Sequence, residues 1–228
     1  MDRGLYIAAS GMLAESIRQD QLANDLANAS TPGYKADRTA QRSFGDILLA
    51  NRETGQQIGP LGLGVSADRT VTDWAPAPIE ETDQPLDLAI DGEGFFAVRT
   101  AQGVRYTRNG QFTTDARGLL LTAQGDEVLS QNGQPVQVAG GKVSAAQVGV
   151  FALANPRKVG DTFVTGTPTG RAAGTIQTGA LEGSGVDPTH AMVDMIASFR
   201  AFQAGQKVIT TLDETLGRAA NNVGSITG

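Results

Sequence analysis

Few side chains in this sequence combine into an arrangement that could carry out chemistry. The segment Gly92-Glu93-Gly94 begins like a phosphate-binding loop, but it lacks the third glycine and the following helix, and no Gly-Lys-Ser/Thr sequence occurs. A turn between two strands explains it better. Nearby acidic side chains could supply oxygen ligands to calcium, but their spacing differs from that of a calcium-binding loop and a solvated strand face explains them: Asp83, Asp87, Asp91 and Glu93.

The chain has one histidine, His190, and no cysteine. The lack of cysteine excludes disulfides, thiolate metal sites and cysteine nucleophiles, and one histidine cannot build a histidine-rich metal site. A Ser-His-Asp triad stays formally open, but the Gly-x-Ser-x-Gly sequence that often holds its nucleophile is missing. We therefore expect no enzyme: no catalytic residue, cofactor, metal or small-molecule substrate.

The composition also limits which classes of binding partner are expected. The 228 residues include 18 Lys and Arg against 24 Asp and Glu, a net charge of −6, without a basic cluster. We expect no nucleic-acid surface and no electrostatic attraction to anionic membranes. Polar residues interrupt the N-terminal segment, so it does not have the pattern of a cleavable secretion signal. The expectation is a cytoplasmic chain or one exported without a cleaved signal.

The clearest patterns in the sequence lie at the two ends of the chain. Residues 3–29 are predicted to form a helix with two apolar stripes, which indicates more than one neighbour. The first stripe contains Leu5, Ala9, Met12, Ser16, Ala23 and Leu26, and the second contains Tyr6, Leu13 and Ile17. The helix ends in LANDLANASTPGYK, where Asn24 and Asn28 stand among alanines. Pro32 and Gly33 end the helix and are predicted to form a hinge.

A second helix is predicted to start at Asp187-Pro188, with Asp as N-cap and Pro in the first turn. Apolar residues then recur every seven residues, with further members at the partner positions: Met195, Phe202, Ile209, Leu216 and Val223, joined by Met192 and Phe199. A single amphipathic helix on a globular core is the alternative. The positions at the two chain ends favour two halves of a coiled-coil-like pair, which would pack against each other and against copies of the chain.

The middle of the chain reads as strands. LDLAIDGEGFFAV at 86–98 predicts a hairpin, and Asn109-Gly110 between two β-rich runs predicts another. Residues 76–185 are therefore expected to form an all-β domain, and residues 36–75, rich in Gly and Pro without periodicity, an extended arm or linker. The predicted fold class is α+β, with a discontinuous helical core domain of residues 1–35 and 186–228.

Three segments together resemble the flagellar rod and hook proteins of bacteria. LANDLANASTPGYK resembles the N-terminal signature of that family, with Asp25 where an Asn is usual. PLDLAIDGEGFFAV and YTRNGQFTTDARGLLLTAQGDEVL resemble the signature of its β domain, and residues 179–221 resemble its C-terminal signature. Within the family, the start MDRGLYIAASGM and the short length are most similar to the proximal, F-type rod subunit, with the distal G-type as the alternative.

The resemblance implies a structural role in the flagellar basal body, in a rod that crosses the periplasm and passes torque from motor to hook. It implies helical self-assembly, contacts with other rod and hook axial proteins, and passage through the flagellar type III export apparatus without a cleaved signal. The residues expected at subunit contacts are Leu5, Ala9, Met12, Asn24, Leu26, Asn28, Met192, Met195, Phe199, Phe202, Ile209, Leu216 and Val223. Alternatives of another class are a coiled-coil adaptor with a β binding domain and a secreted hydrolase.

Overall fold

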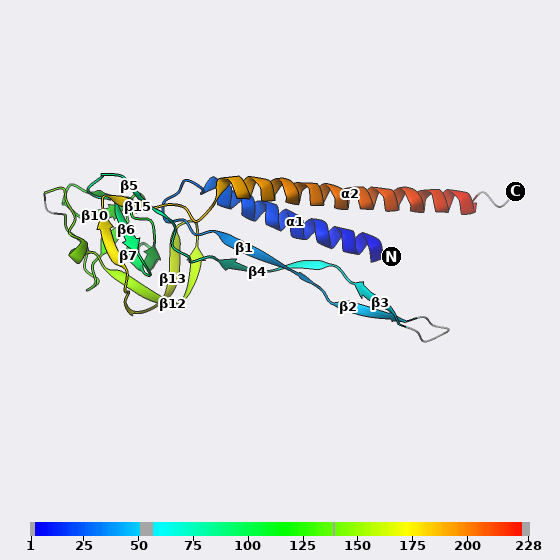
Figure 1. The fold of residues 1–228 in the computed structure, drawn as a ribbon, viewed down its shortest axis with the longest axis horizontal. Coiled ribbons are helices and arrows are strands. Elements are labelled where there is room, and N and C mark those ends of the chain that lie inside the picture. The colour runs from blue at the N-terminus through cyan, green and yellow to red at the C-terminus, as the bar shows by residue number, and fades with distance from the viewer. Residues whose placement is uncertain (1–2, 51–56, 139, 225–228) are drawn as a thin grey trace. The chain divides into compact units, whose positions relative to one another are not determined.

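A computed structural model describes residues 3–50, 57–138 and 140–224. These residues form α+β structure in two compact units (Figure 1). The first unit comprises Met1–Leu26, Asp37–Val71 and Thr189–Gly228, and the second comprises Ala27–Ala36 and Thr72–Pro188. The predicted order, with a helix near each chain end and strands between them, is confirmed.

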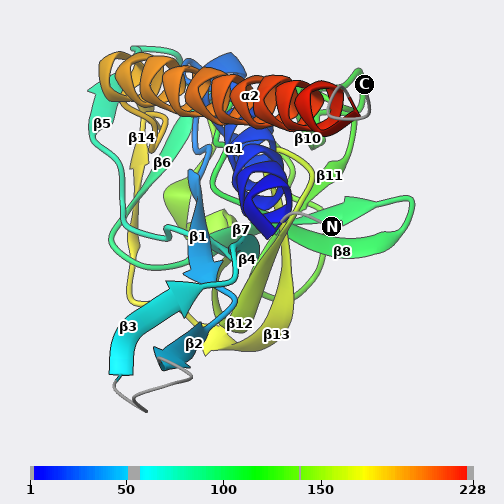
Figure 2. The ribbon, with the colours of Figure 1, turned by 90° about the vertical axis from the view of Figure 1, so that its right-hand side faces the viewer.

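The first unit contains α1 (Arg3–Ala27) and α2 (Pro188–Gly224). The two helices lie side by side and run in opposite directions (Figures 1 and 2). Both helices carry apolar residues at helical spacing, and α1 ends shortly before Pro32, which disfavours a helical residue before it. Neither helix, over its described residues, has an apolar stretch long enough to cross a membrane.

The first unit also contains two strand pairs. Strand β1 (Asp37–Ser43) pairs with β4 (Val65–Thr72), and β2 (Asp46–Ala50) pairs antiparallel with β3 (Gln57–Gly62). Regular backbone pairing thus occurs in a segment whose side chains show no periodicity, because ladder hydrogen bonds come from the main chain.

Side chains tie these strands to α1. The Val65 amide donates to the Ser10 hydroxyl at 3.2 Å, and the Gln41 amide group donates to the Glu15 carboxylate at 3.0 Å. Gly64 lies so close to Ser10 that a Cβ there would meet Ser10 Oγ at 2.5 Å. A glycine is therefore needed where the chain between β3 and β4 meets α1.

The second unit is built on a seven-stranded sheet of order β12-β13-β8-β7-β11-β10-β9, in which the paired strands run antiparallel. Strand β12 also pairs with β7, so β12, β13, β8 and β7 close into a ring. The strands are β7 (Phe95–Thr100), β8 (Gly103–Thr107), β9 (Phe112–Thr114), β10 (Leu120–Thr122), β11 (Glu127–Leu129), β12 (Val150–Val159) and β13 (Phe163–Arg171). A 3-10 turn, Ala145–Gln147, precedes β12.

Two smaller strand pairs complete this unit. Strand β14 (Thr175–Thr178) pairs with β6 (Leu88–Asp91), and β15 (Ala180–Glu182) pairs with β5 (Ile79–Glu81). The main core combines β6 with one face of the sheet, and the rings of Phe96 and Phe112 meet edge to face at 5.3 Å. Its largest fully buried members include Leu88, Ile90, Phe96, Val98, Leu120 and Val128.

Both predicted hairpins are wrong. Strand β6 pairs with β14 and not with β7, and β8 and β9 lie at different places in the sheet. At the first site, Gly94 has φ +135° and its absent Cβ would meet Val150 Cγ1 at 2.4 Å, so the chain crosses over there. At the second, the Gln111 amide donates to the Asn109 side chain at 2.9 Å and the Leu88 amide donates to the Gly110 carbonyl. Local turn chemistry thus forms without strand pairing.

The predicted solvated acidic face is also wrong in part. Asp87 is buried, and its carboxylate accepts a 2.7 Å hydrogen bond from the Thr82 hydroxyl. Leu88, Ala89 and Ile90 are all buried, so β6 is covered on both faces rather than alternating. A carboxylate placed just before such a strand satisfies local hydroxyl and loop groups instead of facing water.

Candidate functional site: helix faces and a buried ion cluster

The contact between α1 and α2 is made by small and polar residues as well as apolar ones. The Ser198 hydroxyl donates to the Glu15 carboxylate at 2.6 Å, and Arg18 lies 3.7 Å from Asp194. A Cβ on Gly205 would lie 2.7 Å from Met12 Cγ. The covered residues of α2 follow steps of four and three: Ala191, Met195, Ser198, Phe202, Gly205, Ile209 and Leu212. Small residues at the close positions therefore let the helices approach.

The heptad residues predicted on α2 divide between two faces. Met195, Phe202 and Ile209 are half-buried in this contact. Met192, Phe199 and Leu216 point away and are 50%, 52% and 48% exposed. The inner face also uses Ala191, Ser198 and Gly205, which the sequence analysis did not select because small residues give no hydrophobic signal; Ala191 and Ser198 each lie one position before a predicted residue. The Val223 side chain lies outside the described part of the structure.

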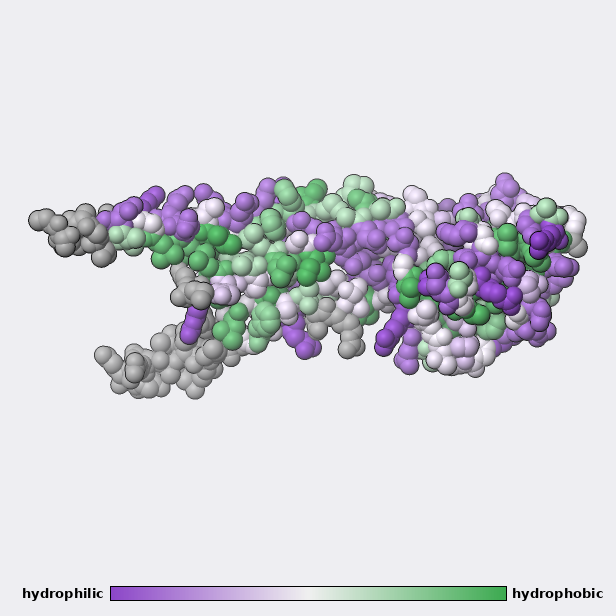
Figure 3. Space-filling view, turned by 180° about the vertical axis from the view of Figure 1, so that it is seen from behind, coloured by the Kyte–Doolittle hydropathy of each residue, from purple (hydrophilic) through white to green (hydrophobic). Residues whose placement is uncertain are grey.

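The predicted contact residues of α1 are similarly distributed. Leu5, Met12 and Leu26 are half-buried, whereas Ala9 and Asn24 are exposed. The second predicted stripe is open: Tyr6, Leu13 and Ile17 are 64%, 65% and 40% exposed. Asn28 is half-buried and belongs to the second unit. Figure 3 shows apolar residues gathered over part of the first unit that is not drawn in grey.

A groove of about 540 Å³ in the first unit lies between the two helices and the β1–β4 strand pair. Small residues of both helices line it, among them Gly4, Ala8, Gly11, Ala201 and Gly205. Such residues leave backbone accessible and permit close approach of another segment. The first unit therefore presents bulky apolar side chains on one surface and a shallow apolar groove on another.

The predicted hinge residues lie within the second unit. Gly33 is buried with φ +66°, and a Cβ there would lie 2.3 Å from the carbonyl carbon of Arg108. Its amide donates to the Glu182 carbonyl at 2.9 Å. Pro32 beside it is half-buried. Both the left-handed backbone and the close approach require glycine at this position.

Gly33 borders a buried ion cluster that the sequence did not predict. Glu182, Lys35 and Arg108 are 1%, 4% and 4% exposed. Lys35 Nζ lies 2.7 Å from Glu182 Oε1, and Arg108 Nη1 lies 3.0 Å from Glu182 Oε2. The backbone supplies further partners: the Ala77 amide donates to Glu182, and Lys35 donates to the Ala75 carbonyl at 2.7 Å. One carboxylate thus serves two buried cations.

Burial and charge act in opposite directions on Lys35. Loss of solvation is the largest cause that lowers the pKa of the Lys35 ammonium below its ordinary value, and the hydrogen bond to Glu182 opposes it. The guanidinium of Arg108 lowers this pKa further, and the Asp73 carboxylate raises it. Glu182 therefore stabilises the charged form of Lys35, which burial disfavours.

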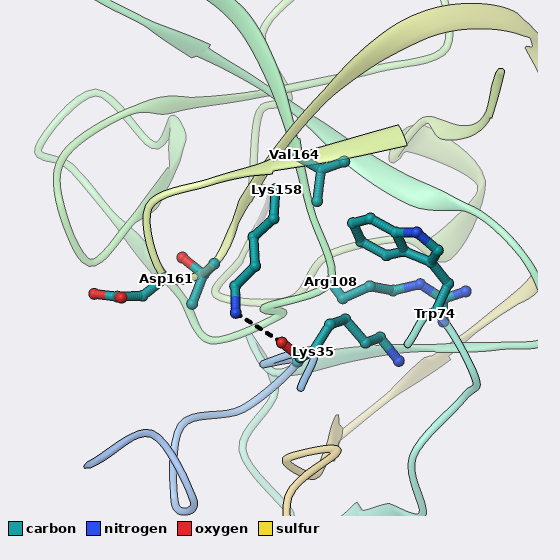
Figure 4. A pocket seen from close by; sticks show the side chains of 8 residues that line it. Lys35, Trp74, Arg108, Lys158, Asp161 and Val164 are labelled. Carbon is teal, nitrogen blue, oxygen red and sulfur yellow. Dashed lines mark hydrogen bonds between the residues drawn. The ribbon is translucent and has the colours of Figure 1, made fainter. Parts of the chain in front are cut away.

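Lys158 adds a third cation at the edge of the cluster (Figure 4). Its ammonium donates to the Lys35 carbonyl at 2.7 Å and lies 3.8 Å from the centre of the Tyr34 ring. A cavity of about 10 Å³ beside it is lined by Trp74 and Arg108, which is room for one water molecule. Arg108 Nε is buried without a hydrogen-bond partner in the described residues, so a water there would satisfy it.

The cluster joins two segments that are distant in sequence. The Ser184 hydroxyl donates to the Asn28 carbonyl at 3.0 Å, and the Gly185 amide donates to the Tyr34 carbonyl at 2.9 Å. The residues that follow α1 and those that precede α2 are therefore fastened together inside the second unit. Of the three residues only Glu182 stands in a segment otherwise poor in charge, because Asp37 and Arg38 follow Lys35 closely and Arg105 precedes Arg108, so the sequence pattern does not mark the cluster.

Comparison with known proteins identifies the family. The family described as flagella basal body rod protein matches residues 5–35, the flagellar hook protein FlgE/F/G D1 domain matches 89–152, and the flagellar basal body rod FlgEFG protein C-terminal family matches 177–222. The flagellar basal-body rod protein FlgG of Bacillus subtilis is 32% identical, over 97% of this chain and 99% of the relative. The chain belongs to the flagellar basal-body rod protein family. The resemblance seen in the sequence is confirmed.

Both types of rod subunit are among the relatives of this family member. The flagellar basal-body rod protein FlgF of Salmonella typhimurium is 32% identical over 96% of this chain and 97% of the relative, and FlgF of Escherichia coli is 33% identical over the same shares. These identities differ from that to the FlgG relative by at most one percentage point, so they do not separate the F-type from the G-type.

Proposed function

We propose that this chain is an axial structural subunit of the flagellar basal-body rod, joined to its neighbours through α1 and α2. The observation that carries the proposal is the apolar surface that these helices leave exposed, with Met192, Ile196 and Phe199 on α2 between 50% and 55% exposed. Large apolar residues gathered on one surface mark protein contacts. The names of the relatives support a place in the rod.

Each subunit offers two unlike surfaces. The exposed stripe of α1, with Tyr6, Leu13 and Ile17, is bulky, whereas the groove between the helices is lined by small residues. A contact between unlike surfaces repeats from subunit to subunit and generates a helical filament when it does not close into a ring. The proposal includes neighbours of the same kind and other rod and hook axial proteins.

The proposal has finer parts. In the rod, residues 1–35 and 186–228 would build a coiled-coil-like core domain, residues 36–75 an arm and residues 76–185 an outer β domain, with Ala27–Ala36 packed in the second compact unit. The rod passes torque from motor to hook, and the chain reaches it through the flagellar type III export apparatus without a cleaved signal. The subunit is of the proximal, F-type, with the distal G-type as the alternative, and it has no enzymatic role.

Phe199 tests the proposed contact, and Phe202 provides a matched control. Phe199→Ala removes an outward ring, so we expect it to leave the unfolding of the purified subunit unchanged within about 0.5 kcal/mol and to reduce its retention in purified basal bodies and motility. Phe202→Ala removes a ring from the α1–α2 contact and should instead destabilise the subunit by about 1–3 kcal/mol, less than full burial would give.

Retention is measured by quantifying the chain in basal bodies from a strain that carries each variant in place of the native gene. Normal retention and normal motility with Phe199→Ala would show that the outward face of α2 is not the subunit contact. Absence of the unaltered chain from basal bodies would overturn the proposed function itself.

A further inference from the structure

The core of the second unit is completed by its last strands. In register, Ile176 of β14 lies opposite Ile90 of β6, and Leu181 of β15 lies opposite Glu80 of β5. Ala172 is part of the main core, and Ile176 packs against it. The Gly174 amide donates to the Glu93 carbonyl at 3.1 Å. Without residues 172–182, β5 and β6 would lack the partner strands they have in the described structure.

The ion cluster has the same dependence on late residues. Lys35 and Arg108 precede Glu182 in the chain by 147 and 74 positions. In the native unit both cations are almost completely buried, and Glu182 is the carboxylate within ion-pair distance of each. Removing one partner of a buried ion pair leaves an uncompensated charge and is strongly destabilising. A unit formed without Glu182 would have to bury two such charges.

We infer that residues 172–182 act as a folding latch, so that the second unit gains stable structure only when Glu182 has joined Lys35 and Arg108. Because chains are synthesised from the N-terminus, the latch keeps the preceding residues of this unit unfolded until residue 182 has been made. For a subunit that is exported as an unfolded chain, this delay favours export over premature folding. That benefit rests on the proposed function, whereas the latch does not.

Hydrogen exchange of the full, unaltered chain tests the latch. If residues 172–182 can detach only when the whole unit unfolds, amides in β14 and β15 will exchange through the same opening as amides in β7 and β8. We expect the highest protection factors of the two groups to agree within about threefold. Exchange of β14 and β15 about 100-fold or more faster than that of β7 and β8 would mean that the sheet stands without the latch, and would overturn the inference.

A charge-removing variant tests the part played by the cluster. Glu182→Gln is expected to lower protection in β7, β8, β14 and β15 together, by about 100-fold or more, because both cations lose their carboxylate. The control is Glu127→Gln, which removes an exposed pair with Arg99 at 3.1 Å in the same unit and should change protection by less than about fivefold. Equal effects of the two variants would overturn the role of Glu182.

The comparison remains decisive if Glu182→Gln does not fold, because the unaltered chain alone shows whether the two groups of strands open together. A failure of this chain to enter basal bodies would leave the exchange result unaffected. The latch and the proposed function therefore fail separately.

Discussion

At the scale of single residues, Glu182 and Gly33 show how tightly the segment after α1 is held. Glu182 bonds to Lys35, Arg108 and the Ala77 amide through its side chain, and to Gly33 through its carbonyl. Gly33 can occupy its place only because it has no Cβ. Substitutions at either end of this contact are therefore expected to act on the stability of the second unit.

Replacing Gly33 by Ala should destabilise the second unit by about 2–5 kcal/mol, which combines the left-handed backbone with a clash against the Arg108 main chain. Gly160→Ala is a matched control, because Gly160 has φ +73° and open space around it, and should cost about 1–2 kcal/mol. Trp74 is the single tryptophan and lines the cavity beside Lys35, so its fluorescence can follow the unfolding of each of the two variants. Equal costs would show that the Arg108 backbone yields.

The pKa of Lys35 gives a pH dependence with a definite sign. A lysine whose pKa is lower in the folded state binds fewer protons there than in the unfolded chain, so its contribution to stability rises as pH increases towards the ordinary value of 10.5. Lys35→Met removes this contribution. Denaturant unfolding across the window below 10.5 should therefore show a smaller rise of stability with pH in Lys35→Met than in the unaltered chain. An equal or larger rise in the variant would contradict the lowered pKa.

At the scale of elements, the sequence predicts what depends on local pattern. Both terminal helices follow from apolar spacing and from Pro at their boundaries, and the strand-rich middle follows from β-branched runs between glycines. The hairpins at Gly92–Gly94 and Asn109–Gly110 fail because pairing in the second unit is non-local: β6 joins β14, about 85 residues away. Turn residues such as Asn-Gly therefore occur between strands that do not pair with each other as well as in hairpins.

The inner face of α2 was missed for a related reason. A search for bulky apolar residues finds Phe199 but passes over Ser198 and Gly205, which lie against α1. Likewise, burial of Lys35, Arg108 and Glu182 depends on segments that meet only in the folded unit. Close approach and buried charge are properties of three-dimensional neighbours, which spacing along the chain does not give.

Two glycines of α2 separate helix propensity from packing. Gly217→Leu should stabilise α2 by up to about 1 kcal/mol, because nothing lies near its Cβ position and Leu is the better helix former. Gly205→Leu gains the same propensity but meets Met12, so we expect a net loss of about 1–3 kcal/mol. Thermal unfolding followed by far-UV circular dichroism compares them. Stabilisation by both would mean that the two helices do not touch at Gly205.

At the scale of the whole molecule, the division into units does not follow the order of the chain. The segment Ala27–Ala36 belongs to the second unit although the residues on both sides of it belong to the first. This segment is held by hydrogen bonds from Gly33, Ser184 and Gly185. A cut in the chain on the C-terminal side of Ala36 should therefore leave the segment Ala27–Ala36 bound to the second unit.

Limited trypsin digestion tests this arrangement. Arg38 and Arg42 are exposed, whereas Lys35 is 4% exposed, so we expect early cleavage after the arginines and not after the lysine. The N-terminal peptide should then stay with the second unit in native size-exclusion chromatography and separate in denaturant, as mass spectrometry of the fractions would show. Early cleavage at Lys35, or a free peptide under native conditions, would contradict the tight embedding of residues 27–36.

The two helices of the first unit differ in length, 37 residues in α2 against 25 in α1. At about 1.5 Å per residue the excess is about 18 Å. From Asp213 to Asn221 every side chain of α2 is exposed, and Leu216 is among them. Under the proposed function, this exposed end of α2 is a surface that a neighbouring subunit would cover.

In a growing rod each arriving subunit would cover one such end and present a new one, so the tip is always ready for the next arrival. With two unlike surfaces on each subunit, an arrival at the tip would also meet a second neighbour, whereas two free subunits that meet make a single contact and gain less. Polymerisation should accordingly start slowly and then proceed quickly, with a lag that short preformed rod fragments abolish.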